Sequence, residues 1–207
     1  MSPDAVKYPA FHVLQGKRVI LASASPRRGL SFEVVPSNFE EDYDKANYDS
    51  PTAYCSATCL KKAQIVLEKT IDTEPSLIIS SDTIVVCEGA IYEKPMDRND
   101  AVQILSAISG KTVDVITAVT MFYLQKDGTY KEVSFDESTE MYMDQYGQDM
   151  IDAYLDTGEG MGFSGAFSYQ GAAFLMIKGI TGCFYNAIGF PVSRFYREFL
   201  KISNQVA

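Results

Sequence analysis

Residues 77–87 read LIISSDTIVVC, in which the apolar residues 77–79 and 84–87 flank Ser80-Ser81-Asp82-Thr83, and Asp82 is the one charged residue. The β-branched residues favour a strand, and an apolar run without alternation is typical of a buried central strand. Glu88 and Gly89 then predict a turn into a hairpin partner at residues 90–92. An unpaired carboxylate would be costly in such a strand. Asp82 is therefore paired with a cation such as lysine, bound to a metal, or used as a base, and the pattern does not choose among these.

Further strands and helices alternate on both sides of this run. Strands are predicted at residues 18–22, 32–36, 113–124, 130–143 and 173–177, helices at 52–69, 99–106, 149–157 and 193–202, and a glycine-rich loop at 158–171. This order predicts an α/β fold with a mixed twisted sheet and flanking helices. A composition break near Thr112 hints at two lobes. Residues 1–16 are predicted to be a loose lead-in, and residues 17–207 a single domain.

Composition excludes several classes of function. The chain has 207 residues and a net charge of -9, which disfavours nucleic acid polymers and anionic membranes as partners. Its one histidine, His12, excludes most Ser-His-Asp and Cys-His mechanisms. The four cysteines form no disulfide-like pattern and predict free thiols in a reducing cytoplasm. No apolar run is long enough to read as a membrane span.

A candidate phosphate loop follows the predicted strand at residues 18–22. It contains Ser23, Ser25, Arg27 and Arg28. Small hydroxyl residues and backbone N–H groups can surround phosphate oxygens, and arginines supply bidentate donors. The spacing is not that of a Walker loop. The alternative is a capped helix start with two solvated arginines.

Other charged residues are candidates for the same site. Glu40 and Glu41 form an acidic pair in a predicted loop. Magnesium takes one or two carboxylates together with substrate phosphates, so one of the pair is a candidate ligand, although such pairs are often only solvated surface. Lys62, on the predicted helix, and Lys94, before a proline, are candidates for holding phosphates. A lone lysine is more often surface than site.

Short motifs run in order from about Val19 to Arg197. They are LASASPRR at 21–28, FEVVPS at 32–37, Lys62-Ala63, Ser81-Asp82-Thr83, Lys94-Pro95, Leu105 with Ser109-Gly110-Lys111, Glu137-Ser138-Thr139, Thr157-Gly158-Glu159, Tyr169-Gln170-Gly171, and Tyr185-Asn186 with Gly189-Phe190-Pro191. In order and spacing these motifs together resemble the Maf family of nucleotide pyrophosphatases.

The resemblance implies hydrolysis of a nucleoside triphosphate to the monophosphate and diphosphate with a divalent metal cation, Mg²⁺ or Mn²⁺. It also implies a fold similar to that of inosine triphosphate pyrophosphatases, with two lobes around a central cleft, and frequently a homodimer. Asp82 would accept the proton of the attacking water, and Glu41 would lie near the metal. The phosphate contacts would come from Ser23, Ser25, Arg27, Arg28, Lys62 and Lys94.

Substrate choice divides the family the chain resembles. One branch prefers dTTP and UTP, and the other prefers 7-methyl-GTP. Arg27, Thr83 and Gln170 look like the dTTP/UTP branch. The amide of Gln170 can both donate to and accept from a pyrimidine base. The alternatives are a pyrophosphatase for a modified or non-standard nucleotide, a nucleotide-binding regulatory protein with impaired catalysis, and a plain structural or partner-binding domain.

Two departures from the family pattern stand out. Arg28 runs directly into Gly29, where the family has a helix of about seven residues, or ~10 Å. Either the helix has been left out of this numbering, which we favour, or the phosphate loop is altered. The family's Asp-Lys-Ala-Gly is replaced by Gly162-Phe163-Ser164-Gly165, which removes a cation near the base pocket.

Overall fold

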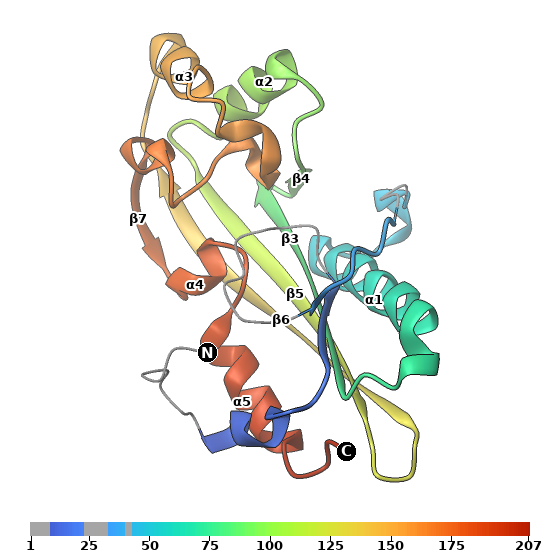
Figure 1. Cartoon of the computed structure of the whole chain (residues 1–207). Coiled ribbons are helices and arrows are strands. Elements are labelled where there is room, and N and C mark those ends of the chain that lie inside the picture. The colour runs from blue at the N-terminus through green and yellow to red at the C-terminus, as the bar shows by residue number, and fades with distance from the viewer. Residues whose placement is uncertain (1–8, 23–32, 40–42) are drawn as a thin grey trace.

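The protein is described by a computed structural model that covers residues 9–22, 33–39 and 43–207 (Figure 1). Within these ranges one sheet has seven strands in the order β2-β1-β3-β5-β6-β7, with β4 paired to β3. The strands are β1 Val19–Ala22, β2 Glu33–Val34, β3 Leu77–Cys87, β4 Ala90–Tyr92, β5 Thr112–Leu124, β6 Tyr130–Met143 and β7 Ile177–Thr181. β1 is parallel to β2 and β3, and every other pair is antiparallel. The predicted mixed sheet is confirmed.

Helices cover the sheet at three places. They are α1 Pro51–Thr70, α2 Arg98–Ile108, α3 Gln148–Leu155, α4 Phe184–Ala187 and α5 Val192–Ile202. Helix α1 begins sharply because the Ser50 side chain accepts a hydrogen bond from the Ala53 N–H and Pro51 occupies the first turn. Figure 1 shows α1 against the side of the sheet near β1 and β3, α2 and α3 at one end, and α5 at the other. Of the helices within the described residues, none combines the length and hydropathy that crossing a bilayer requires.

Strand β3 lies in the middle of the sheet and is buried along almost its whole length. Its alternate side chains face opposite layers. Ile84 and Val86 pack with Cys55 and Cys59 of α1. Asp82 is two residues before Ile84, so its side chain points to the same face of β3, the face that α1 covers.

The two lobes are the two ends of the same long strands. At one end a core cluster combines residues of β3, β5 and β6 with α2 and α3, and at the other end a second cluster combines β1, β3 and β5 with α5. The composition break near Thr112 does not separate them, because β5 begins at Thr112 and runs through both. The expectation that this break marks the lobes is wrong.

The predicted loose lead-in is ordered over its described part. Pro9–Leu14 forms a 3-10 helix, η1. The Phe11 ring lies 5.4 Å from the Phe199 ring and 6.3 Å from the Phe195 ring, centroid to centroid. Aromatic packing against α5 therefore holds this segment in the core.

The strand predicted at residues 173–177 is displaced. Ala172–Met176 forms a 3-10 helix, η6, and β7 begins only at Ile177. Ala173 and Met176 are buried, whereas Phe174 and Leu175 are 60% and 61% exposed. This spacing of three is the period of a 3-10 helix and not of a strand. The loop predicted at 158–171 likewise contains two short 3-10 helices, η4 Gly160–Gly162 and η5 Ser164–Ala166.

Candidate active site

Asp82 and Lys62 form a buried ion pair between β3 and α1. The Lys62 Nζ lies 2.6 Å from the Asp82 Oδ1, and the two side chains are 13% and 9% exposed. A contact of this length between an ammonium group and a carboxylate is a charge-assisted hydrogen bond. The pairing that the apolar context of Asp82 demands is therefore present, and Lys62 supplies the cation.

Cys55 reaches the same aspartate from the same helix. Its Sγ lies 3.4 Å from the Asp82 carbonyl oxygen and 3.6 Å from the Asp82 Oδ2. Cys55 and Lys62 are seven positions apart, which is about two turns of α1, so both face β3. Sequence reasoning treated Cys55 only as a free thiol, although its spacing from Lys62 could have placed it on the same face.

The cysteines give a test of this packing. Cys55, Cys59 and Cys87 are buried, and burial raises the pKa of each thiol. Cys183 is only partly buried. Because the thiolate is the reactive form, we expect a thiol reagent at pH 8 to modify Cys183 quickly in the native protein and all four cysteines after unfolding. Rapid modification of Cys55 or Cys59 under native conditions would contradict the α1 packing, because both lie on α1. A Cys183→Ser variant identifies the thiol that reacts quickly.

Thr83 points away from this pair. Its Oγ1 lies 3.0 Å from the Thr117 Oγ1, and the Ser164 Oγ donates to its carbonyl oxygen at 2.8 Å. Neighbouring residues of a strand face opposite sides of the sheet. The structure therefore brings Lys62 to Asp82, while the Thr83 side chain lies on the opposite face.

Gln170 is exposed on a loop that Glu159 braces. The Ala172 N–H donates to the Glu159 Oε2 at 2.7 Å, and Gly171 packs so tightly against this carboxylate that a Cβ would collide with it. Glu159 belongs to one of the family motifs, and here it holds the next motif in place. The absence of a side chain at Gly171 is what permits this close approach.

We expect Gly171→Ala to destabilise the protein. The added methyl group would displace the Glu159 carboxylate from the Ala172 N–H, at a cost of about 1–3 kcal/mol in the free energy of unfolding. Urea denaturation measures this difference. Gly162→Ala is the matched control, since nothing lies within 4 Å of a Cβ there. Equal stabilities of the two variants would show that Glu159 does not brace the loop.

Lys94 is exposed and makes no ion pair with Asp82 in the part of the chain that the structure describes. The residue before it is firmly held, because Glu93 accepts from the Tyr54 hydroxyl and from Lys45, each at 2.6 Å. The phosphate contact predicted for Lys94 stays a prediction.

The phosphate-loop residues Ser23, Ser25, Arg27 and Arg28, and the metal candidate Glu41, lie outside the described residues. The structure does show where β1 ends. Ala22, its last residue, is in register with Ser80 of the parallel strand β3. The chain therefore leaves β1 beside the part of β3 that carries Asp82.

A metal site is not complete within the described residues. Across residues 9–22, 33–39 and 43–207 there is no cluster of three or more His, Cys, Asp or Glu side chains that could hold an ion. Magnesium needs only one or two protein carboxylates when phosphates and water fill its other positions. The described residues therefore do not test the predicted metal site, and the role of Glu41 stays a prediction.

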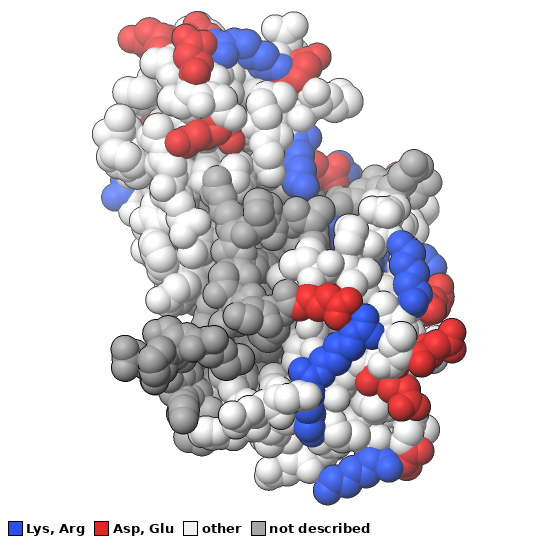
Figure 2. Space-filling view, in the orientation of Figure 1, with Lys and Arg blue, Asp and Glu red and all other residues white. Residues whose placement is uncertain are grey.

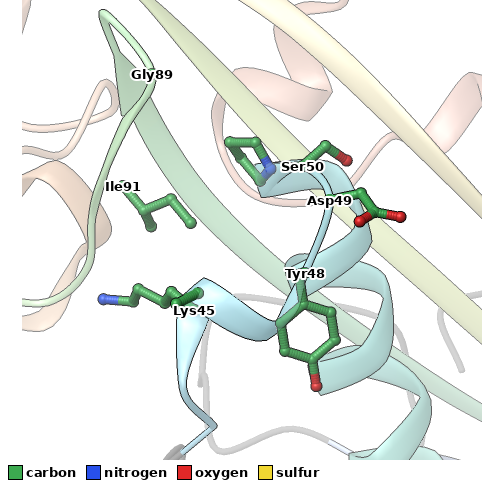
Figure 3. Close-up of a pocket in the computed structure, with 8 residues that line it drawn as sticks. Lys45, Tyr48, Asp49, Ser50, Gly89 and Ile91 are labelled. Carbon is green, nitrogen blue, oxygen red and sulfur yellow. The ribbon is translucent and has the colours of Figure 1, made fainter.

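A surface pocket of about 340 Å³ lies between the start of α1 and the β3–β4 turn (Figure 3). It is lined by Lys45, Ala46, Tyr48, Asp49, Ser50, Pro51, Gly89 and Ile91. None of the predicted site residues that the structure describes lines it. The pocket lining therefore does not include the Lys62–Asp82 pair.

Comparison with known protein families matches residues 18–202 to the family described as Maf-like protein. The chain belongs to this family. The Maf-like chain is 34% identical over 206 residues to the dTTP/UTP pyrophosphatase of Agathobacter rectalis. The alignment covers 91% of this chain and 99% of that protein. It is 35% identical over 189 residues to the dTTP/UTP pyrophosphatase of Bacillus cereus, and the alignment covers 88% of each protein.

A human relative is larger. The Maf-like chain is 35% identical over 209 residues to the human protein named probable bifunctional dTTP/UTP pyrophosphatase/methyltransferase, covering 94% of this chain and 33% of the human protein. The chain thus spans about a third of that relative. Among solved structures, a nucleoside-triphosphatase / dITP/XTP pyrophosphatase from Mycobacterium abscessus aligns with a TM-score of 0.37 at 12% identity, over 61% of this chain and 74% of that one.

The connection after Arg28 is short in the sequence of the Maf-like chain. Its 207-residue sequence is continuous from Arg28 to Gly29. The alignment with the Bacillus cereus relative has 189 positions, whereas 88% of the 207 residues of this chain is about 182. The relative therefore carries residues that this chain lacks. The comparisons do not place these extra residues along the chain, so the explanation favoured from the sequence, a helix left out of the numbering, stays a prediction.

Proposed function

We propose that this chain is a nucleoside triphosphate pyrophosphatase that hydrolyses dTTP and UTP to the nucleoside monophosphate and diphosphate. The observation that carries the proposal is the buried Lys62–Asp82 pair in the middle strand, beside the end of β1 where the phosphate-loop motif begins. The names of the bacterial relatives support the same activity.

Asp82 is the proton acceptor in this proposal. The oxygen of a water molecule attacks the α-phosphorus, the bond from the α-phosphorus to the bridging oxygen breaks, and diphosphate leaves with the bonding electrons. The water proton passes to the Asp82 carboxylate, which Lys62 keeps ionised in the resting enzyme. Of the described groups at this site, the Asp82 carboxylate is the best suited to accept the proton, because the single histidine, His12, lies in η1.

Cationic side chains stabilise the charge of the triphosphate and of the leaving diphosphate. Arg27, Arg28 and Lys94 would contact the phosphates, and Lys62 would move from Asp82 toward them as the proton is taken up. A bound Mg²⁺ or Mn²⁺ would supply further charge neutralisation, with Glu41 near it. Ser23 and Ser25 would donate hydroxyl hydrogen bonds to phosphate oxygens.

The pyrimidine preference rests on the loop that carries Gln170. Its amide is exposed, and the Glu159 brace fixes the backbone that follows it. A base whose hydrogen-bonding edge does not match would leave the amide unpaired, which penalises binding. Thr83 lies on the face opposite Asp82, so a Thr83 contact would be to a part of the nucleotide remote from the scissile bond.

Diphosphate release from dTTP, UTP, CTP, 7-methyl-GTP and ITP, measured side by side with Mg²⁺, with Mn²⁺ and with a chelator, tests the proposal. We expect the highest kcat/KM on dTTP and UTP, and loss of activity with the chelator. A faster rate on ITP or 7-methyl-GTP would reject the pyrimidine preference. Full activity in the chelator would reject the metal.

A second candidate is a nucleotide-binding regulatory protein with impaired catalysis. The sequence runs directly from Arg28 to Gly29, where the family pattern that it resembles has a helix next to the phosphate-loop motif, and this departure favours the second candidate. This candidate predicts that dTTP raises the melting temperature without releasing diphosphate. The same panel of nucleotides therefore separates the two.

We further propose a cytoplasmic homodimer that binds neither a nucleic acid polymer nor a membrane. Four free cysteines suit a reducing compartment. In Figure 2 the described Lys and Arg side chains are interspersed with Asp and Glu rather than forming a basic stripe. Phe174, Leu175, Phe184 and Tyr185 are large exposed apolar residues and would suit a subunit contact. Light scattering after size exclusion would give the mass.

A further inference from the structure

We propose that Cys55 is a positioning residue for Asp82, whose thiol hydrogen bond keeps the carboxylate turned to receive a proton from water. This inference rests on the proposed role of Asp82 as proton acceptor.

The geometry places the thiol against the carboxylate on the side that Lys62 does not occupy. Lys62 contacts Oδ1 at 2.6 Å, and the Cys55 Sγ lies 3.6 Å from Oδ2. Distances up to about 4 Å are normal for hydrogen bonds that involve sulfur. Two side chains from one helix thus contact both oxygens of one carboxylate, which restricts its rotation about the Cβ–Cγ bond.

The thiol acts here as a donor. Burial first, and then the negative charge of Asp82, raises the pKa of Cys55 far above its usual range. The sulfur therefore keeps its proton at every pH at which the enzyme would work, and a protonated thiol can donate to a carboxylate. A sulfur lone pair facing that carboxylate would instead be repelled.

The thiol also has other acceptors nearby. Its Sγ lies 3.4 Å from the Asp82 carbonyl oxygen and 3.8 Å from the Ile116 carbonyl oxygen. An ionised carboxylate is the stronger acceptor, so the proton points to Oδ2 while Asp82 is charged. Once Asp82 has accepted a proton from water, the thiol can rotate to either carbonyl, and no buried donor is left unpaired. The Cys55 thiol thus stabilises the charged form of Asp82 and still has an acceptor when Asp82 is protonated.

Cys55→Ala removes the donor with little change in volume, and Cys55→Ser restores one. For Cys55→Ala we expect kcat to fall about 2- to 10-fold with little change in KM, as for loss of one neutral hydrogen bond. The acid limb of the kcat/KM profile should move to higher pH by roughly 0.5–1 unit, since the charged form loses a donor. Cys55→Ser should return the profile toward that of the parent.

Cys59→Ala is the matched control. Cys59 is equally buried one turn further along α1, but its Sγ contacts the Ala118 carbonyl oxygen at 3.4 Å and not the carboxylate. We expect it to lower stability as much as Cys55→Ala does and to leave the pH profile unchanged. Identical pH profiles for the parent and both alanine variants would overturn the proposal.

Infrared spectroscopy of the S–H stretching band tests the contact without any turnover. The Cys55 band is identified by its loss in Cys55→Ala, and we expect it to shift when Asp82 is replaced with Asn, because the charged acceptor is gone. An unshifted band would overturn the proposal even in an active enzyme. If the parent released no diphosphate from any nucleotide, the proposed function would fail, while the band would still decide whether Cys55 donates to Asp82.

Discussion

Asp82→Asn is expected to lower kcat on dTTP by about 100- to 10,000-fold, the usual contribution of a general base. Asparagine keeps the shape of the side chain and removes its ability to accept a proton. We expect the KM for dTTP to change by much less, because the proposed phosphate contacts come from other residues. Diphosphate release at saturating nucleotide measures the effect.

A change of charge elsewhere should have no such effect. Asp72, exposed in the 3-10 helix η3 Ile71–Thr73, provides the control variant Asp72→Asn. Turnover by Asp82→Asn within a few-fold of this control would reject Asp82 as the base. The Lys62–Asp82 contact would then be a structural ion pair only.

Lys62→Met is expected to have the largest effect on stability, about 3 kcal/mol in the free energy of unfolding at neutral pH. Methionine keeps the apolar stem of the side chain but removes the ammonium group, which lies 2.6 Å from the Asp82 carboxylate. Asp82 is only 7% exposed, so water cannot easily replace that group. We also expect kcat/KM to fall about 10- to 100-fold, as for loss of one charge-assisted hydrogen bond. Urea denaturation and steady-state rates measure the two effects.

The stability difference should depend on pH. In the parent, the ion pair favours the ionised carboxylate, and its stabilisation is lost as falling pH protonates Asp82. In Lys62→Met, burial without that cation favours the neutral form, so protonation relieves a penalty. The gap between parent and variant should therefore shrink as pH falls. Lys61→Met makes the same chemical change at the adjacent position, and we expect almost no loss there; equal losses in the two variants would show that the pair does not matter.

Long, strongly patterned segments could be predicted from the sequence. Strand β3 has the bounds expected for it, because the apolar runs at 77–79 and 84–87 do not alternate with polar residues and are typical of a strand buried on both faces. Helix α1 lies within a residue of its predicted ends, because Pro51 can open a helix and occupies its first turn. Short elements could not be predicted in the same way. Helix α4 has four residues and too few turns to show a period.

The sequence by itself determined that Asp82 needs a partner, because a lone charge among apolar residues is too costly to leave unpaired. It could not determine which partner, since every lysine looks alike in the chain. Only the packing of α1 across β3 selected Lys62 and brought Cys55 with it. The choice depends on distances between residues far apart in sequence, which local patterns of hydrophobicity do not encode.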